Sequence, residues 1–307
     1  MDQELHVRHL SDDELRPKLQ SLAARSRKYC IITLICFALF FIGLFLAFIG
    51  PIEGYAVLCL VIPAFIGAIV FGMFWSSASA KLKAFVGQHV IVDVLAEAFE
   101  DVEYSPFRYI DRKVIEAARL ITQWNVIKGS DLVEGRYRDV KITFSDIELI
   151  EKKSSGKSTS SITKFRGQWL ICELAKTLPA SLRLSERYIE GRGGKSDVET
   201  ENVAFNAKYR IKTSDKYTAF YVLTPHFMEY IMSMDERADA LTYLGFMKSK
   251  VHIALHNRRD LFVVHDKKLM EGDGLAKLRK QVRSDIEYIT DVLDELLLNE
   301  YLFRKAD

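Results

Sequence analysis

The sequence has few cysteines and lacks the spacings of common disulfide and metal sites. Its 307 residues include four cysteines and seven histidines, and no Cys-x-x-Cys occurs. Cys30, Cys36 and Cys59 fall in apolar runs, which leaves Cys172 without a partner in the rest of the chain. These features exclude a disulfide scaffold and a cysteine-histidine zinc site, and they are typical of a reducing compartment.

The chain also lacks a charge excess and the short motifs of common enzymes. Its 43 basic and 41 acidic residues give a formal net charge of +2, which does not indicate a nucleic-acid partner. No G-x-S-x-G, H-E-x-x-H or G-x-G-x-x-G occurs. We therefore predict no catalytic residue, no cofactor site and no metal site.

Two loops, around Lys157 and Lys195, superficially resemble phosphate-binding loops. A P-loop requires a glycine five residues before its Gly-Lys pair, because the backbone must wrap the phosphates. Glu151 and Ile189 occupy those positions. We interpret both segments as solvated loops.

What the sequence does contain is two long uncharged runs, residues 29–49 and 55–75. At about 1.5 Å per residue, each is long enough to cross a hydrocarbon core of about 30 Å. A cleavable signal peptide would have a shorter apolar stretch. We predict a transmembrane helical hairpin over residues 29–75, after an N-terminal segment of residues 1–28. Neither run contains an ionisable residue, which argues against a transporter or channel.

Basic residues flank this hairpin on one side of the membrane. Arg25, Arg27 and Lys28 precede the first run and Lys81 follows the second, whereas the connecting loop carries only Glu53. By the positive-inside rule, both termini face the cytoplasm. The bilayer is then the first partner of the chain, and the remaining mass is cytoplasmic.

Residues 77–307 are predicted to form one cytoplasmic α+β domain with a largely antiparallel sheet. The hydrophobic period indicates helices over residues 77–103 and 111–122, within a helical part of residues 77–125. Residues 130–265 are rich in β-formers at a period of two. We interpret residues 151–164 as a Ser-rich hairpin loop and residues 218–224 as a strand.

Later elements complete this domain. Thr224-Pro225 predicts the start of a helix that extends to about residue 241. Residues 251–265 are interpreted as a hairpin whose turn is Asn257 to Asp260. A long helix over residues 275–303 carries an apolar stripe that we expect to pack within the chain, formed by Leu278, Val282, Ile286, Ile289, Leu293 and Leu296.

Few side chains in this domain suggest a binding role. His252 and His256 would lie about 13 Å apart on one strand face, too far for one metal, and we interpret them as sheet-surface residues. Four aromatic residues are expected to pack in the sheet: Tyr209, Tyr217, Phe220 and Tyr221. Arg258 and Arg259, in the predicted turn, are the residues we single out for contact with a partner or with acidic lipid.

Two short motifs carry a resemblance to a known family. They are F-x-G at Phe165 to Gly167 and L-T-P-x-F-M at Leu223 to Met228. Together with the order of the surrounding segments, they resemble a family of bacterial membrane proteins known only as a domain of unknown function. The resemblance covers roughly residues 105–265, and some family members are encoded beside LemA-type membrane proteins. It implies a bacterial origin and this architecture, and hence an inner-membrane location; it makes a LemA-type membrane protein a candidate partner, and it lends no activity.

Three function classes follow from these observations. The leading hypothesis is a membrane-anchored cytoplasmic interaction module, a scaffold or adaptor without catalytic activity, that recruits a protein partner. The alternative is a module that binds lipid headgroups at the inner-membrane surface. The third is an enzyme whose site is assembled from residues far apart in sequence. Whether the chain self-associates is left open.

The predicted topology can be tested directly. A reporter fused to either terminus should report a cytoplasmic location, because the basic flanks of the hairpin lie on that side. The measurement is the activity of a compartment-sensitive reporter in intact cells. A periplasmic signal from the C-terminal fusion would contradict this topology and the function hypotheses built on it.

Overall fold

The structure, a computed structural model, describes residues 11–49, 54–156, 158–186 and 195–303. They form two compact units. The first comprises Met1–Ile91 with Val264–Lys280, and the second comprises Val92–Val263 with Gln281–Asp307. We describe each unit by itself.

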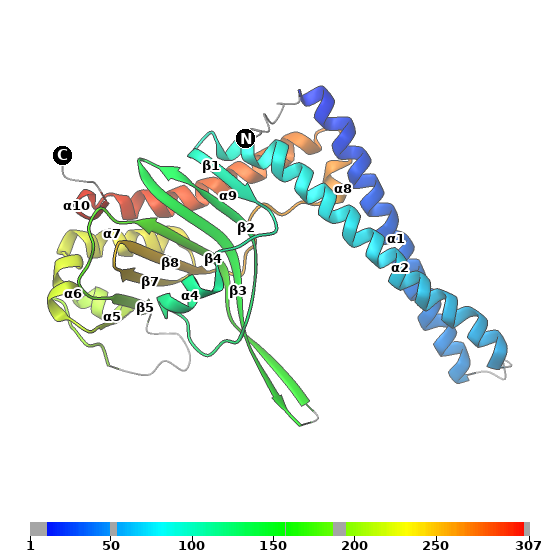
Figure 1. Cartoon of the computed structure of the whole chain (residues 1–307), viewed down its shortest axis with the longest axis horizontal. Coiled ribbons are helices and arrows are strands. Elements are labelled where there is room, and N and C mark those ends of the chain that lie inside the picture. The colour runs from blue at the N-terminus through cyan, green and yellow to red at the C-terminus, as the bar shows by residue number, and fades with distance from the viewer. Residues whose placement is uncertain (1–10, 50–53, 157, 187–194, 304–307) are drawn as a thin grey trace, which may run out of the picture. The chain divides into compact units, whose positions relative to one another are not determined.

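The first unit is built on a pair of long helices, α1 (Asp12–Ile49) and α2 (Gly54–Val86). Figure 1 shows them side by side as a hairpin. Tyr29 contacts Phe71 and Phe74 across the pair, with ring centroids 6.5 and 5.6 Å apart. Both helices are long and apolar enough to cross a membrane. The connecting loop with Glu53 lies outside the described residues.

Shorter elements complete this unit. A π-helix, η1 (Gly87–Ile91), follows α2, and α8 spans Asp266–Leu269. Asp12, in the first turn of α1, accepts two hydrogen bonds of 2.7 and 2.8 Å from the guanidinium of Arg279. Such a bidentate pair fixes geometry well, because the planar guanidinium matches the carboxylate.

The second unit contains an antiparallel sheet, which confirms the predicted α+β fold. The strands are β1 (Glu100–Ser105), β2 (Val126–Tyr137), β3 (Val140–Ser155), β4 (Ser158–Glu173), β5 (Leu182–Glu186), β6 (Tyr209–Thr213), β7 (Leu241–Met247) and β8 (Lys250–His256). Their order in the sheet is β1-β2-β3-β4-β8-β7-β5-β6. The helices are α3 (Val92–Leu95), α4 (Arg112–Ala118), α5 (Val203–Lys208), α6 (Lys216–Val222), α7 (Pro225–Ala238), α10 (Glu300–Phe303) and the part of α9 (Gly274–Leu297) from Gln281 onward.

Helices cover both faces of this sheet (Figure 1). On one face, Ile115 and Ala118 of α4 pack in a core with Trp169 and Tyr243. On the other face lie α7 and α9, where Phe227 of α7 contacts Phe246 of β7 with ring centroids 5.8 Å apart. The predicted stripe of the C-terminal helix is buried, which confirms that it packs within the chain.

Two segments predicted as helix or loop are strands. Residues 100–105, at the end of the predicted helix over 77–103, form β1 and pair with β2. Residues 151–164, predicted as a loop, continue β3 and β4 as a ladder whose last pair is Ser155 with Ser158. Serine and threonine are compatible with a solvent-exposed ladder, so polarity alone did not mark a loop here.

The strand predicted over residues 218–224 is wrong, because Lys216–Val222 form helix α6. Asp215 caps this helix: its carboxylate accepts hydrogen bonds from the backbone N–H groups of Tyr217 at 3.2 Å and Thr218 at 2.9 Å. Tyr217, Phe220 and Tyr221 are therefore exposed on a helix surface, not packed in the sheet. Tyr209 is in the core, as predicted.

The last hairpin also differs from the prediction. Leu241, the expected end of a helix, instead begins β7 (Leu241–Met247), which pairs with β8. The helix α7 begins as predicted, with Thr224 as its N-cap, but it ends at Ala238. Asn257 to Asp260 is thus not a turn between strands. It leaves the sheet, and the backbone N–H of Leu261 donates to the carboxylate of Asp146 at 2.7 Å.

Gly167, in the F-x-G motif, lies where β4 meets the end of β8. Its φ is +151°, and a Cβ atom there would collide with the carbonyl oxygen of Leu255. The missing side chain at this glycine thus permits a close approach of two backbone segments. Phe165 is fully buried, with its ring centroid 5.8 Å from that of Trp169.

Gly167→Ala should therefore destabilise the second unit by about 2 kcal/mol or more, since both the φ angle and the space exclude a side chain. The measurement is thermal unfolding of the full chain in detergent. The matched control is Gly272→Ala, whose Cβ would meet no atom within 4 Å. Equal melting of the two variants would contradict the predicted constraint.

Candidate functional site

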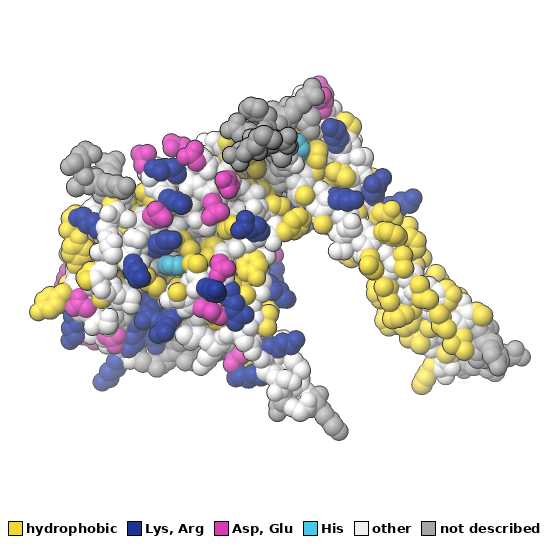
Figure 2. Space-filling model, in the orientation of Figure 1, with side chains coloured by type: hydrophobic (Ala, Val, Ile, Leu, Met, Phe, Trp, Pro, Cys, Tyr) yellow, Lys and Arg dark blue, Asp and Glu magenta, His cyan; other side chains and the backbone are white. Residues whose placement is uncertain are grey.

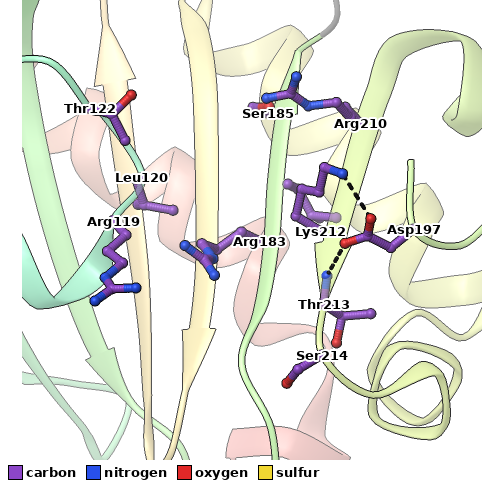
Figure 3. A pocket seen from close by; sticks show the side chains of 11 residues that line it. Arg119, Leu120, Thr122, Arg183, Ser185, Asp197, Arg210, Lys212, Thr213 and Ser214 are labelled. Atoms are coloured by element: carbon purple, nitrogen blue, oxygen red, sulfur yellow. Dashed lines mark hydrogen bonds and ion pairs between the residues drawn. The ribbon is translucent and has the colours of Figure 1, made fainter. Parts of the chain in front are cut away.

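A basic pocket lies on the α4 face of the sheet, over β5 and β6 (Figure 3). Its volume is about 450 Å³. Four cationic side chains and one carboxylate are among its lining residues, which are Arg119, Leu120, Thr122, Arg183, Leu184, Ser185, Asp197, Arg210, Lys212, Thr213 and Ser214. All of them belong to the second unit. We call this cavity the basic pocket.

The alternation of two paired strands places most of these charges. In β5, Leu182 and Leu184 are fully buried while Arg183 and Ser185 point to the other face. In β6, Tyr209 and Ile211 are likewise buried, and Arg210 and Lys212 alternate with them. Because Arg183 pairs with Lys212 and Ser185 pairs with Arg210, all four polar side chains share one face of the sheet.

The remaining cation comes from the end of α4. Arg119 is the C-cap of that helix and adopts a left-handed conformation with φ of 51°. The next residue, Leu120, is buried over Gly245 of β7, where a Cβ atom would lie 2.8 Å from the leucine Cδ2. The lack of a side chain at Gly245 thus lets this segment approach the sheet and form one wall of the pocket.

Asp197 forms the opposite wall. Its Oδ1 lies 2.7 Å from the Nζ of Lys212, and its Oδ2 accepts a hydrogen bond of 3.0 Å from the backbone N–H of Thr213. The Lys212 ammonium is the main reason that the pKa of this carboxyl is held below its usual range. Asp197 is therefore ionised at neutral pH and is a poor general base.

Arg183 has spare hydrogen-bonding capacity. Its Nε–H group is buried and has no hydrogen-bond partner among the residues that the structure describes. A buried donor without a partner is unfavourable, and an anion in the pocket would satisfy it. With four cations against one carboxylate, the geometry is suited to binding an anionic group.

A second pocket, of about 460 Å³, lies beside α9 and has the opposite charge. Its lining includes Arg259 together with the carboxylates of Asp260, Asp285, Glu287 and Asp291. The neighbouring Arg166 forms an ion pair of 2.7 Å with Asp260. This region therefore combines both charge signs, and an anion would be attracted to it less than to the basic pocket.

Three lining residues of this second pocket, Gln168, Asn257 and Tyr288, belong to a hydrogen-bonded network. Gln168 donates to Asp146 at 3.0 Å and to the carbonyl oxygen of Arg259 at 2.8 Å. Asn257 donates to Gln168 at 2.6 Å and to the hydroxyl of Tyr288 at 2.9 Å. Burial raises the pKa of Asp146 to about 7, although the hydrogen bonds from Gln168 and Leu261 oppose this effect.

The two sheet histidines act as hydrogen-bond acceptors. His252 is buried, not at the sheet surface as predicted, and its Nδ1 accepts a bond of 3.2 Å from the indole of Trp169. Burial lowers the pKa of His252 to about 4, so the ring is neutral. His256 accepts from the backbone N–H of Arg166 at 3.2 Å.

The residues singled out from the sequence are not part of the basic pocket. Arg258 and Arg259 are both exposed, and their contact with a partner or with acidic lipid remains a prediction. Lys195 is exposed, and Lys157 lies outside the described residues. Sequence reasoning missed Arg183, Arg210 and Lys212, although the i, i+2 spacing of basic residues in two β-rich segments was a usable signal.

Comparisons with known proteins confirm the predicted resemblance to a family of unknown function. Residues 163–298 match the family model described as "Protein of unknown function (DUF3137)", which begins and ends later than the predicted range of residues 105–265. No curated protein matches the chain. A solved structure, the mycobacterial trehalose monomycolate transport factor A (TtfA), aligns with a TM-score of 0.35 at 8% identity, covering 66% of this chain and 95% of that chain.

The raised pKa of Asp146 predicts a pH dependence of stability. Because the folded state holds this proton more tightly, the stabilisation is present below about pH 4 and is lost as the pH rises through about 7. Between pH 5.5 and 7.5 we expect the free energy of unfolding to fall by about 2 kcal/mol through this group. The variant Asp146→Asn should lack this decrease. Thermal unfolding across this range is the measurement. The exposed substitution Asp139→Asn is the control, and a slope unchanged by Asp146→Asn would refute the assignment.

Proposed function

We propose that the chain is a bacterial inner-membrane module without catalytic activity of its own, whose folded unit binds an anionic ligand in the cytoplasm. The observation that carries this proposal is the basic pocket, where Arg119, Arg183, Arg210 and Lys212 surround one cavity. Its carboxylate, Asp197, is ionised and bound to Lys212, so it is poorly suited to proton transfer. Binding is therefore better supported than catalysis.

The surface of the helical hairpin supports the membrane anchor. Only 11% of the most apolar window of each long helix is buried, whereas a core helix of a soluble protein would be mostly buried. Large side chains such as Phe45 and Phe48 are 63% and 90% exposed. Figure 2 shows hydrophobic side chains covering this part of the hairpin. Such a surface is unfavourable in water, and a bilayer would cover it.

The orientation belongs to the same proposal. The basic residues at one end of the hairpin support a cytoplasmic location for both termini, by the positive-inside rule. The folded unit would then share a compartment with the anionic inner leaflet and with the soluble anions of the cell. An anionic lipid headgroup is thus one natural source of the ligand, in line with the lipid-binding alternative from the sequence.

A protein partner is the second candidate, favoured by a different surface. Tyr217 is 86% exposed, and Phe220, Tyr221 and Tyr301 are also exposed on α6 and α10. Tyr221 and Tyr301 lie with ring centroids 5.5 Å apart. Exposed aromatic groups of this kind are enriched at protein interfaces. A LemA-type membrane protein would be one such partner, and crosslinking in native membranes would identify it.

Anion binding can be tested with pyrophosphate as the probe. Calorimetric titration of the full chain in detergent, at low salt, should detect binding that weakens at least about tenfold in the variant Arg183→Gln/Lys212→Gln, because two charged donors are lost. The matched control, Arg258→Gln/Arg259→Gln, removes two exposed cations outside the pocket and should bind normally. Loss of binding only in the control would move the site to that segment, and binding unchanged in both would refute the proposal.

A further inference from the structure

We infer that the basic pocket takes a phosphorylated polyol, that is, a phosphate group carried on a hydroxyl-rich body. This inference rests on the proposed function and specifies its ligand. It depends on how the charged groups are distributed in the pocket, on the polar groups between them and on the size of the cavity.

The cationic side of the pocket fits a phosphate group. Figure 3 shows Arg119 and Arg183 reaching into the same side of the cavity from two different elements. A guanidinium offers a planar fork of donors that matches two oxygens of a phosphate, and the buried Nε–H of Arg183 is a donor without a partner among the described residues. A phosphate monoester carries a charge of about −1.5 to −2 at neutral pH and accepts from several donors at once. A ligand with one carboxylate in place of the phosphate would offset less of the positive charge of the pocket.

The opposite wall would repel a bare anion. Asp197 stands there as a carboxylate, on the far side of Arg183 from Arg119 (Figure 3). Each of its oxygens already accepts one hydrogen bond, from Lys212 and from the backbone of Thr213, and each retains capacity for another. A ligand with hydroxyl donors beside its phosphate would use both walls. Inorganic phosphate also keeps a P–OH donor at neutral pH, but that donor lies on the charged group itself, so the ion cannot place its charge at one wall and a hydroxyl at the other.

The rest of the lining suits a hydroxyl-rich body. Ser185 and Ser214 contribute hydroxyl groups, and Leu120 contributes an apolar side chain on the same face of the sheet. The volume of about 450 Å³ is far more than a phosphate ion requires and falls within the range of about 300–1,000 Å³ that is usual for small-molecule sites. The pocket therefore has room for a polar body attached to the phosphate.

Two sources could supply this chemistry, a soluble sugar or polyol phosphate and the phosphodiester headgroup of a polyol lipid. The first arm of the test uses soluble probes with the full chain in detergent and phosphate-free buffer. Glycerol 1-phosphate and inositol 1-phosphate should bind at least about tenfold more tightly than inorganic phosphate, and unphosphorylated inositol should bind undetectably. Arg183→Gln should weaken binding of every phosphate probe.

The variant Asp197→Asn distinguishes the contributions of the two walls to binding. This variant should bind the polyol phosphates several-fold more weakly, because an acceptor for their hydroxyl groups is impaired. It should bind inorganic phosphate as well as before or better, because a repelling charge is lost. Thermal unfolding identifies any loss of folding in this variant, and Ser214→Ala provides a second, milder change at the polyol end. Equal weakening of inorganic and polyol phosphates by Asp197→Asn would overturn the assigned role of this wall.

The second arm places the full chain in nanodiscs and follows hydrogen exchange of Leu182–Glu186 and Tyr209–Thr213. Protection with phosphatidylglycerol but not with phosphatidylserine at equal charge would identify a lipid headgroup, and protection by soluble inositol 1-phosphate alone would identify a soluble ligand. Protection in neither case would overturn the inference. If pyrophosphate still binds through Arg183 and Lys212 but polyol phosphates bind no more tightly than inorganic phosphate, the inference fails and the proposed function stands.

Discussion

The basic pocket depends on the pairing of β5 with β6 and β7. This pairing buries Leu182, Leu184 and Ile211 under the helices of one face. Burial of each such side chain stabilises the fold by about 1.5–3 kcal/mol, and a slip of one residue would bury Arg183 and Lys212 instead. The hydrophobic side of these strands therefore fixes the register, and the register places the cations on the opposite face.

Gathering these cations opposes folding. Arg183 and Lys212 are direct cross-strand neighbours, and like charges in that position destabilise a sheet. Asp197 offsets part of this repulsion through its ion pair with Lys212. A bound anion would offset more, and any ligand that binds only the folded state raises its stability by mass action. Ligand binding and stability of the second unit are thus expected to be linked through these residues.

The sequence was informative wherever one local pattern decided the structure. The uncharged runs predicted the two long helices, Thr224-Pro225 predicted the start of α7, and the stripe from Leu278 to Leu296 predicted the buried face of α9. It failed where distant partners decided. Residues 151–164 extend because β3 and β4 pair with each other, and residues 241–247 are a strand because they lie between β5 and β8. At α6, the capping carboxylate of Asp215 outweighed the β-propensity of the aromatic residues that follow.

The same limit explains why the candidate site was not found from sequence. Arg119 is about 60 residues before Arg183 in the chain, and only the docking of Leu120 over Gly245 brings their elements together. The sequence instead directed attention to Arg258 and Arg259, because charges adjacent in a chain are easier to recognise than charges adjacent in space. Their neighbourhood in the fold contains several carboxylates, whereas the pocket over β5 and β6 contains one.

The two pockets differ in how far their buried polar groups are satisfied within the chain. Beside α9, the side chains of Gln168, Asn257 and Tyr288 donate to one another, to Asp146 and to backbone carbonyl oxygens. A buried polar network of this kind has its partners within the chain, so its contribution is to hold α9 on the sheet. In the basic pocket, the buried donor of Arg183 has no such partner among the described residues. A fold that leaves a charged donor unsatisfied next to an open cavity gains most from a ligand that completes the hydrogen bonding, and this difference is our reason for proposing the basic pocket as the binding site.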